Sequence, residues 1–121
     1  RMLRLVSRHA DMWNMWAMPS KFAERAAVLD QACESIGRDP VTVRRSTQAL
    51  VCLTDSESTA RSFLDATGGR AAFAGTAKQF ADLAAQWHDA GVDELVVPDW
   101  HLGTGAQRAE SIEAITAALR A

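Results

Sequence analysis

The chain has 121 residues, of which 48% are hydrophobic and 23% are charged, and its formal net charge is −2. These values are ordinary for a globular domain and argue against a disordered chain. The 13 basic and 15 acidic residues are spread along the chain without a block of either sign, so the sequence shows no electrostatic footprint for nucleic acid or an anionic membrane. We expect a small-molecule substrate or a protein partner, with no nucleic acid and no membrane.

The two cysteines, Cys33 and Cys52, are far apart and lie inside apolar stretches. This spacing favours reduced core thiols over a disulfide or zinc framework and, with no secretory h-region, predicts a cytoplasmic protein. No apolar run approaches the ~20 residues that a membrane-spanning helix needs. The chain opens with Arg1 and has methionine second, so we expect a segment with an upstream part.

The first third of the chain predicts a helix, a short strand and a second helix. Leu5, Val6 and His9 share one face of a helical pattern, with Arg4 and Arg8 outside it, and the letters ADMWN then indicate a buried strand. From Pro19 onward apolar residues recur at intervals of three and four until Gly37, as one helix face requires. These residues are Phe22, Ala26, Leu29, Cys33 and Ile36.

The middle of the chain predicts a strand and two helices. Residues 45–53 are rich in Thr, Val and Leu, which is typical of a strand. Asp55 or Ser56 can cap a helix near residues 57–66, which the glycine pair 68–69 stops. Thr76 and Gln79 then form a capping box before a helix that closes at Gly91.

The letters AGVDELVVPDW, residues 90–100, switch from the end of a helix to consecutive apolar residues. A strand without polar alternation is typical of a parallel sheet, so we expect residues 95–97 to be buried on both faces. Thr104 and Gln107 predict a second capping box. The inner face of the last helix is then Ile112, Ile115 and Leu119.

Helices alternate with three strands in this reading, which predicts a parallel α/β layer. In such folds the segments after the carboxyl ends of the strands build the binding site. We therefore expect residues 13–15, 54–55 and 99–101 to lie on one rim.

Three segments, in this order, resemble one known family: RMLRLVSRHADMWN, FAERAAVLDQACESIGRDP and GTAKQFADLAAQWHDAGVDELVV. They are similar to the luciferase-like monooxygenases, a superfamily of TIM-barrel oxidoreductases that use flavin mononucleotide (FMN) or the deazaflavin coenzyme F-420. Together they cover nearly the whole chain. One departure is Ala77, where the family usually has proline, although the capping box is kept.

The resemblance implies that residues 1–121 are a single segment, the C-terminal part of a TIM (β/α)8 barrel, because a complete barrel needs about 250 residues. It implies hydride transfer between FMN or coenzyme F-420 and a small organic substrate. In the family the residues that cradle the cofactor phosphate and contact its ring come largely from segments upstream of Arg1, so this segment alone is expected to be inactive. Its unpaired sheet edges should bind the remainder of the barrel or form a homo-oligomer. The alternative is a noncatalytic half-barrel module that dimerises or binds a protein partner.

Five residues are candidates for contact with substrate or cofactor: Trp13, Asn14, Asp99, Trp100 and His101. The Asn14 amide can both donate and accept, although it could simply cap a loop. Trp13 is equally suited to the core. Asp99 and His101 could serve acid–base chemistry, or belong to a solvated loop with Trp100 covering the barrel end. No residue is assigned as catalytic.

Other motifs predict structure only. The glycines 68–69 lack the spacing of a nucleotide fingerprint, and the pair at 75–76 is explained by its capping box. His9, His88 and His101 stand on three different predicted elements without ligand spacing, so no metal site is expected.

Overall fold

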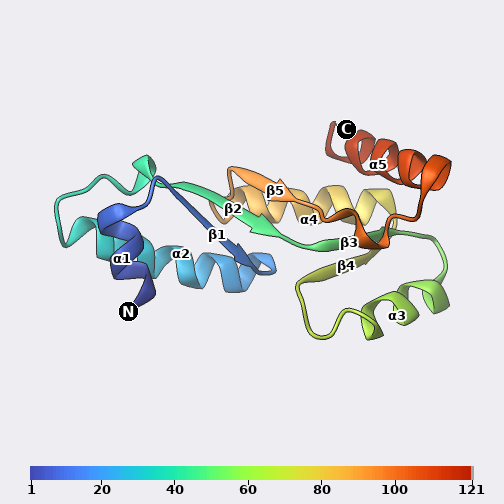
Figure 1. The fold of residues 1–121 in the computed structure, drawn as a ribbon, viewed down its shortest axis with the longest axis horizontal. Coiled ribbons are helices and arrows are strands. Elements are labelled where there is room, and N and C mark those ends of the chain that lie inside the picture. Colours follow the sequence, from blue (N-terminus) through green and yellow to red (C-terminus); the bar gives the residue numbers. More distant parts are fainter. Residues whose placement is uncertain (121) are drawn as a thin grey trace.

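The computed structural model describes residues 1–120 and alternates helices with strands along an elongated molecule (Figure 1). Two short 3-10 helices, η1 (Pro40–Thr42) and η2 (Asp99–His101), stand in the loops. The main elements are α1 (Met2–His9), β1 (Met12–Trp16), α2 (Pro19–Glu34), β2 (Arg44–Gln48), β3 (Leu50–Leu53), α3 (Glu57–Asp65), β4 (Ala72–Gly75), α4 (Ala77–Asp89), β5 (Glu94–Val96) and α5 (Gly105–Arg120).

Strands β1, β2 and β5 form one parallel sheet, in that spatial order. Helix α2 joins the first two strands, and the chain then passes through β3, α3 and β4 before α4 leads into the third strand. The predicted parallel α/β layer is confirmed. The position of this layer within a complete barrel stays a prediction.

The single strand expected over residues 45–53 is instead two strands that share one extended path and belong to two sheets. The change of partner falls between Ala49, whose N–H donates to the Val96 carbonyl (3.2 Å), and Leu50, whose N–H donates to the Ala71 carbonyl (2.9 Å). Beyond this point β3 pairs in parallel with β4, and α3 connects the two (Figure 1). The sequence analysis missed β4 because its letters AFAG hold no β-branched residue.

Helices α2 and α4 cover one face of the three-stranded sheet. Trp13 is only 8% exposed and its ring centroid lies 5.1 Å from that of Phe22. Trp87 of α4 is fully buried and donates its Nε1–H to the Ala17 carbonyl (2.9 Å). The apolar stripe predicted for α2 is therefore confirmed, except that Ile36 follows the helix end and is exposed.

The face predicted for α1 is wrong. Leu3 and Ser7 are buried, whereas Leu5 and His9 are exposed. Leu3, Val6 and Ser7 follow the three- and four-residue spacing of a helix face, and this is the side that packs towards α2.

The burial expected around β5 and α5 is also wrong. Val96 is 36% exposed, because no described element covers that face of the sheet. On α5, Ile115 and Ala118 are buried, whereas Ile112 and Leu119 are exposed. The capping box at Thr76 is present.

The capping box predicted at Thr104 is not formed in residues 1–120. Gly103 and Gly105 both have positive φ (84° and 53°) at the start of α5. The Arg108 guanidinium closes the turn by donating Nε–H to the Gly103 carbonyl (3.1 Å). Among the described helices none has the length and apolar character that crossing a bilayer requires.

Candidate functional site

The sheet face opposite α2 and α4 carries a mixed polar surface that is largely uncovered. Register places Asn14 beside Ser46, and Ser46 beside Glu94, so their side chains form one row across this face. Side chains alternate along each strand, which places every second residue on the same side. We call this surface the open face; its residues are Met12, Asn14, Trp16, Arg44, Ser46, Gln48, Glu94 and Val96.

Hydrogen bonds and an ion pair organise the open face. Asn14 Nδ2–H donates to Ser46 Oγ at 2.6 Å. Arg44 Nη2 pairs with Glu94 Oε2 at 3.1 Å, with both side chains partly exposed. Asn14 is exposed, and its amide oxygen and second N–H have no partner within residues 1–120. The row can therefore offer a donor and an acceptor to a ligand at one place.

Two tryptophans join the carboxyl ends of β1 and β5. The ring centroids of Trp16 and Trp100 lie 5.9 Å apart, with 33° between the ring planes. Trp100 is 62% exposed, so the pair presents flat aromatic surface to solvent. Sequence reasoning missed Trp16, although strand alternation puts it on the same face as Asn14.

The Asp99 carboxylate forms an ion pair with the last helix. Its Oδ2 lies 3.1 Å from Arg108 Nη1 of α5, and the same guanidinium group donates to the Gly103 carbonyl. Asp99 thus fastens η2 to α5. The residues after Asp99 on η2 are Trp100 and His101.

His101 stands at a second place, a cavity of about 400 Å³ between β3, η2 and α5 that we call the rim cavity. Its ring meets that of Phe63 of α3 edge-on, with 5.4 Å between the centroids. The polar lining of the rim cavity, besides His101, is Cys52, Thr54, Thr59, Gln107, Glu110 and Ser111. Burial raises the pKa of the Cys52 thiol.

The five predicted site residues therefore occupy three places. Asn14 lies on the open face, and Trp100 covers the neighbouring carboxyl end with Trp16. His101 lines the rim cavity together with Thr54, and Asp99 fastens the segment that carries it. Trp13 lies in the core on the opposite side of the sheet, a position that fits the core alternative.

Residues 1–120 contain no group of three or more His, Cys, Asp or Glu side chains placed to hold one metal ion. The polar groups of the open face and the rim cavity are instead suited to hydrogen bonding with an organic ligand.

A comparison with protein-family models gives no match, and a comparison with curated protein sequences gives none either. The structure is similar to a long-chain alkane monooxygenase, with a TM-score of 0.70 and 12% identity over 98% of this chain and 38% of that one. It is also similar to the coenzyme F420 dependent tetrahydromethanopterin reductase from Methanopyrus kandleri, with a TM-score of 0.71 and 15% identity over 94% of this chain and 46% of that one.

The chain thus spans less than half the length of either solved structure. At these identities the likeness establishes the fold, a parallel α/β arrangement that matches part of each of the two proteins. The resemblance to the luciferase-like proteins is confirmed at this level.

Proposed function

We propose that the chain is part of a luciferase-like barrel oxidoreductase that transfers hydride between a flavin or deazaflavin and a small organic substrate. The two similar structures support the class, since one is described as a monooxygenase and the other as a coenzyme F420 dependent reductase. The open face is the observation that carries the proposal. In a complete barrel the helices lie outside, so this face of the strands would point towards the interior.

Residues of β1 and of the segment after β5 fit a flat heteroaromatic ring. Trp16 and Trp100 offer aromatic surface for stacking, and the free amide groups of Asn14 suit the carbonyl and N–H edge of such a ring. A bound flavin or deazaflavin would supply the hydride chemistry, and the protein would supply position and electrostatics. These groups suit FMN and coenzyme F-420 equally.

Asp99 and His101 have different parts in this proposal. Asp99 is a positioning residue, since its carboxylate is held by Arg108 while the η2 backbone carries Trp100 and His101. His101 is exposed at the rim cavity, where its imidazole nitrogens can form hydrogen bonds with a bound molecule. We propose that it contacts the substrate.

The test is to purify the protein at its natural length and identify any bound small molecule by mass spectrometry, followed by fluorescence titration with FMN and coenzyme F-420. We expect one of the two to bind, and Trp100→Ala to weaken that binding at least about tenfold by removing the stacking surface. Met12→Ala, on the same open face, is the matched control and should change binding less than twofold. A natural-length protein that binds neither cofactor contradicts the proposal.

The 121-residue chain alone should bind both cofactors weakly, because the phosphate contacts of the family are expected upstream of Arg1. Fluorescence titration of this chain is the measurement. Submicromolar binding would show that the site is complete within these residues.

One observation favours the second candidate, a noncatalytic module. β1 and β5 are the edges of the three-stranded sheet, and the open face carries both a cation and an anion, Arg44 and Glu94. In a two-fold symmetric dimer, Arg44 of one copy could lie beside Glu94 of the other. A natural-length protein that dimerises, binds no cofactor and turns over no substrate would favour this candidate.

A further inference from the structure

A groove between α1 and α2 concentrates positive charge on the helix-covered side of the molecule. It has a volume of about 790 Å³, and its polar lining comes from Arg1 and Arg4 of the first segment and from Arg25, Gln31 and Ser35 of α2 and its end. A smaller adjoining hollow of about 260 Å³ shares Arg4 and Ser35 with it and adds Arg8. We call the two together the arginine groove.

Arginine side chains line the arginine groove, but no acidic side chain does. No aspartate or glutamate lines either hollow, and the ion pairs of residues 1–120 include none of the groove arginines. Arg25 is half-buried there, and its guanidinium makes no hydrogen bond within the described residues. The chain as a whole has a net charge of −2, so this local excess is not a consequence of composition.

Arg4 and Arg8 are exposed, as on a solvated helix face, but the half-buried Arg25 adds a further charge to the same surface. Arg4 and Arg8 are four residues apart on α1, a spacing at which like charges destabilise a helix. Arg25 comes from a second helix and lines the same hollow as Arg4. Charges of one sign around a concave surface focus the electrostatic field and raise the local concentration of counter-ions.

We propose that the arginine groove binds a ligand that carries two or more linked phosphate groups. Guanidinium forks match phosphate oxygens in bidentate geometry, and a tetrahedral phosphate can accept from arginines on two helices at once. Gln31 and Ser35 add neutral donors at the same surface. The volume is within the range of small-molecule sites. The groove lies between helices and shares no residue with the open face, so the proposal does not depend on the proposed oxidoreductase activity.

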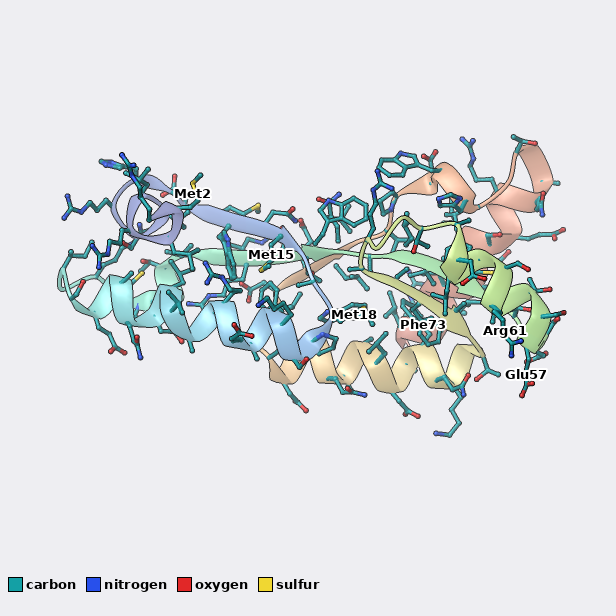
Figure 2. All side chains as sticks on the ribbon, turned by 90° about the horizontal axis from the view of Figure 1, so that it is seen from below. Met2, Met15, Met18, Glu57, Arg61 and Phe73 are labelled. Carbon is teal, nitrogen blue, oxygen red and sulfur yellow. The ribbon has the colours of Figure 1, made fainter. Side chains whose placement is uncertain are left out.

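The test is isothermal titration of the full chain with inorganic tripolyphosphate at low ionic strength. Arg4→Gln and Arg25→Gln should each weaken binding at least about tenfold, since each removes a charge-assisted contact. The matched control is Arg61→Gln on α3, an exposed arginine at the other end of the molecule, labelled in Figure 2 near Glu57. It should change binding less than twofold, and glutamine keeps helix propensity in all three variants.

Four further ligands define the specificity. Citrate is highly charged without phosphate and should bind at least about tenfold more weakly than tripolyphosphate; equal binding overturns the phosphate assignment. Adenosine should not bind. ADP that binds more tightly than inorganic pyrophosphate identifies a nucleotide as the source, and equal binding identifies free polyphosphate; either result supports the shared chemistry.

Hydrogen exchange of the unmodified chain tests the proposal without any substitution, so it remains informative if a variant fails to fold. Tripolyphosphate should slow exchange in α1 and in α2 from Arg25 onward. No detectable tripolyphosphate binding, slowing confined to other elements, or equal loss of affinity in the Arg61→Gln control would each overturn the proposal.

Discussion

Asn14 and Trp13 are neighbours in β1 and point to opposite sides of the sheet. Asn14 Nδ2 lies 2.6 Å from Ser46 Oγ on the open face, whereas the Trp13 ring lies 5.1 Å from Phe22 in the core. Successive side chains of a strand alternate between its two faces, so the pair marks the boundary between packing and binding surface. The two residues should therefore respond differently to substitution.

Asn14→Ala should leave the free energy of unfolding within about 1 kcal/mol of the unsubstituted chain, because it removes one partly exposed hydrogen bond. Trp13→Ala should lower it by about 3–5 kcal/mol, the usual cost of deleting a buried aromatic side chain. Denaturant titration followed by circular dichroism measures both. In the natural-length protein, Asn14→Ala should also lower turnover with little change in melting temperature.

Met12→Ala, two residues away on the same face, is the control for the Asn14 variant. It removes side-chain volume from the open face without removing an amide. If Asn14→Ala destabilises the chain as strongly as Trp13→Ala, Asn14 has a core role and the open-face assignment is wrong.

Asp30 and Arg45 form an ion pair that ties α2 to the start of β2. The Arg45 side chain is 11% exposed and that of Asp30 is 41% exposed, so the pair is half-shielded from solvent. Asp30→Ala would leave a nearly buried guanidinium with only a long contact to the Pro40 carbonyl, at 3.4 Å. We expect a loss of about 1–3 kcal/mol in the free energy of unfolding.

The control for Asp30 is Asp82→Ala, which breaks the exposed pair between Asp82 and Lys78 on α4. Exposed pairs of this kind contribute about 0.5 kcal/mol or less. Both values come from denaturant titrations in the same buffer. Equal effects in the two variants would show that the burial of Arg45 adds nothing to the pair.

The two cysteines should differ in reactivity. Cys33 is fully buried in the core, whereas Cys52 lines the rim cavity. Burial raises the pKa of the Cys52 thiol, so at neutral pH it holds less thiolate than an ordinary exposed cysteine. Iodoacetamide should therefore label Cys52 slowly, at a rate that increases as the pH approaches that raised pKa.

Mass spectrometry of the labelled native chain gives the site and the rate. Cys52→Ser should remove native-state labelling, and denaturant should expose Cys33 in the same variant. Fast labelling of Cys33 in the native chain would mean that the core around α2 opens readily.

The sequence correctly predicted those features that depend only on residues within one helix. The stripe on α2 and the capping box at Thr76 follow from spacing within a few residues, and the structure has both. The change of strand partner after Ala49 could not be predicted in this way, because it depends on which distant strand provides the next carbonyl acceptor. Ala49 donates to Val96, and Leu50 donates to Ala71.

The same distinction applies to the candidate site. The sequence predicted that Asn14 follows a strand and shares one rim with His101, but Asn14 is the third of the five residues of β1 and lies beside Ser46 in the middle of β2, whereas His101 follows β5 on η2. The contact between Trp16 and Trp100 and the ion pair between Asp99 and Arg108 join separate elements. Residue spacing carries no signal for such contacts, which is why Trp16 was missed.

The exposure of Val96 reverses the expectation from the sequence. Three consecutive apolar residues predicted a strand buried on both faces, in which a lysine would not be tolerated. In the structure β5 is an edge strand, and Val96 is 36% exposed on the open face. We now expect Val96→Lys to lower the free energy of unfolding by about 1 kcal/mol or less. Leu95→Lys should cost more, about 2–3 kcal/mol, because the half-buried Leu95 packs against the core cluster that contains Phe80 and Trp87 of α4.

The open face and its two edge strands should make the 121-residue chain self-associate, because open edges and uncovered sheet surface favour pairing with another chain. A lysine at Val96 adds a charge to this surface and should weaken association at least about tenfold if the face is the contact. Sedimentation equilibrium over a wide concentration range, with circular dichroism of the same samples, measures association and folding together. Ala109→Lys, at an exposed position of α5 outside the rim cavity, is the control and should leave both unchanged. A folded monomer at every concentration would contradict association through the open face, and association that Val96→Lys leaves intact would place the contact elsewhere.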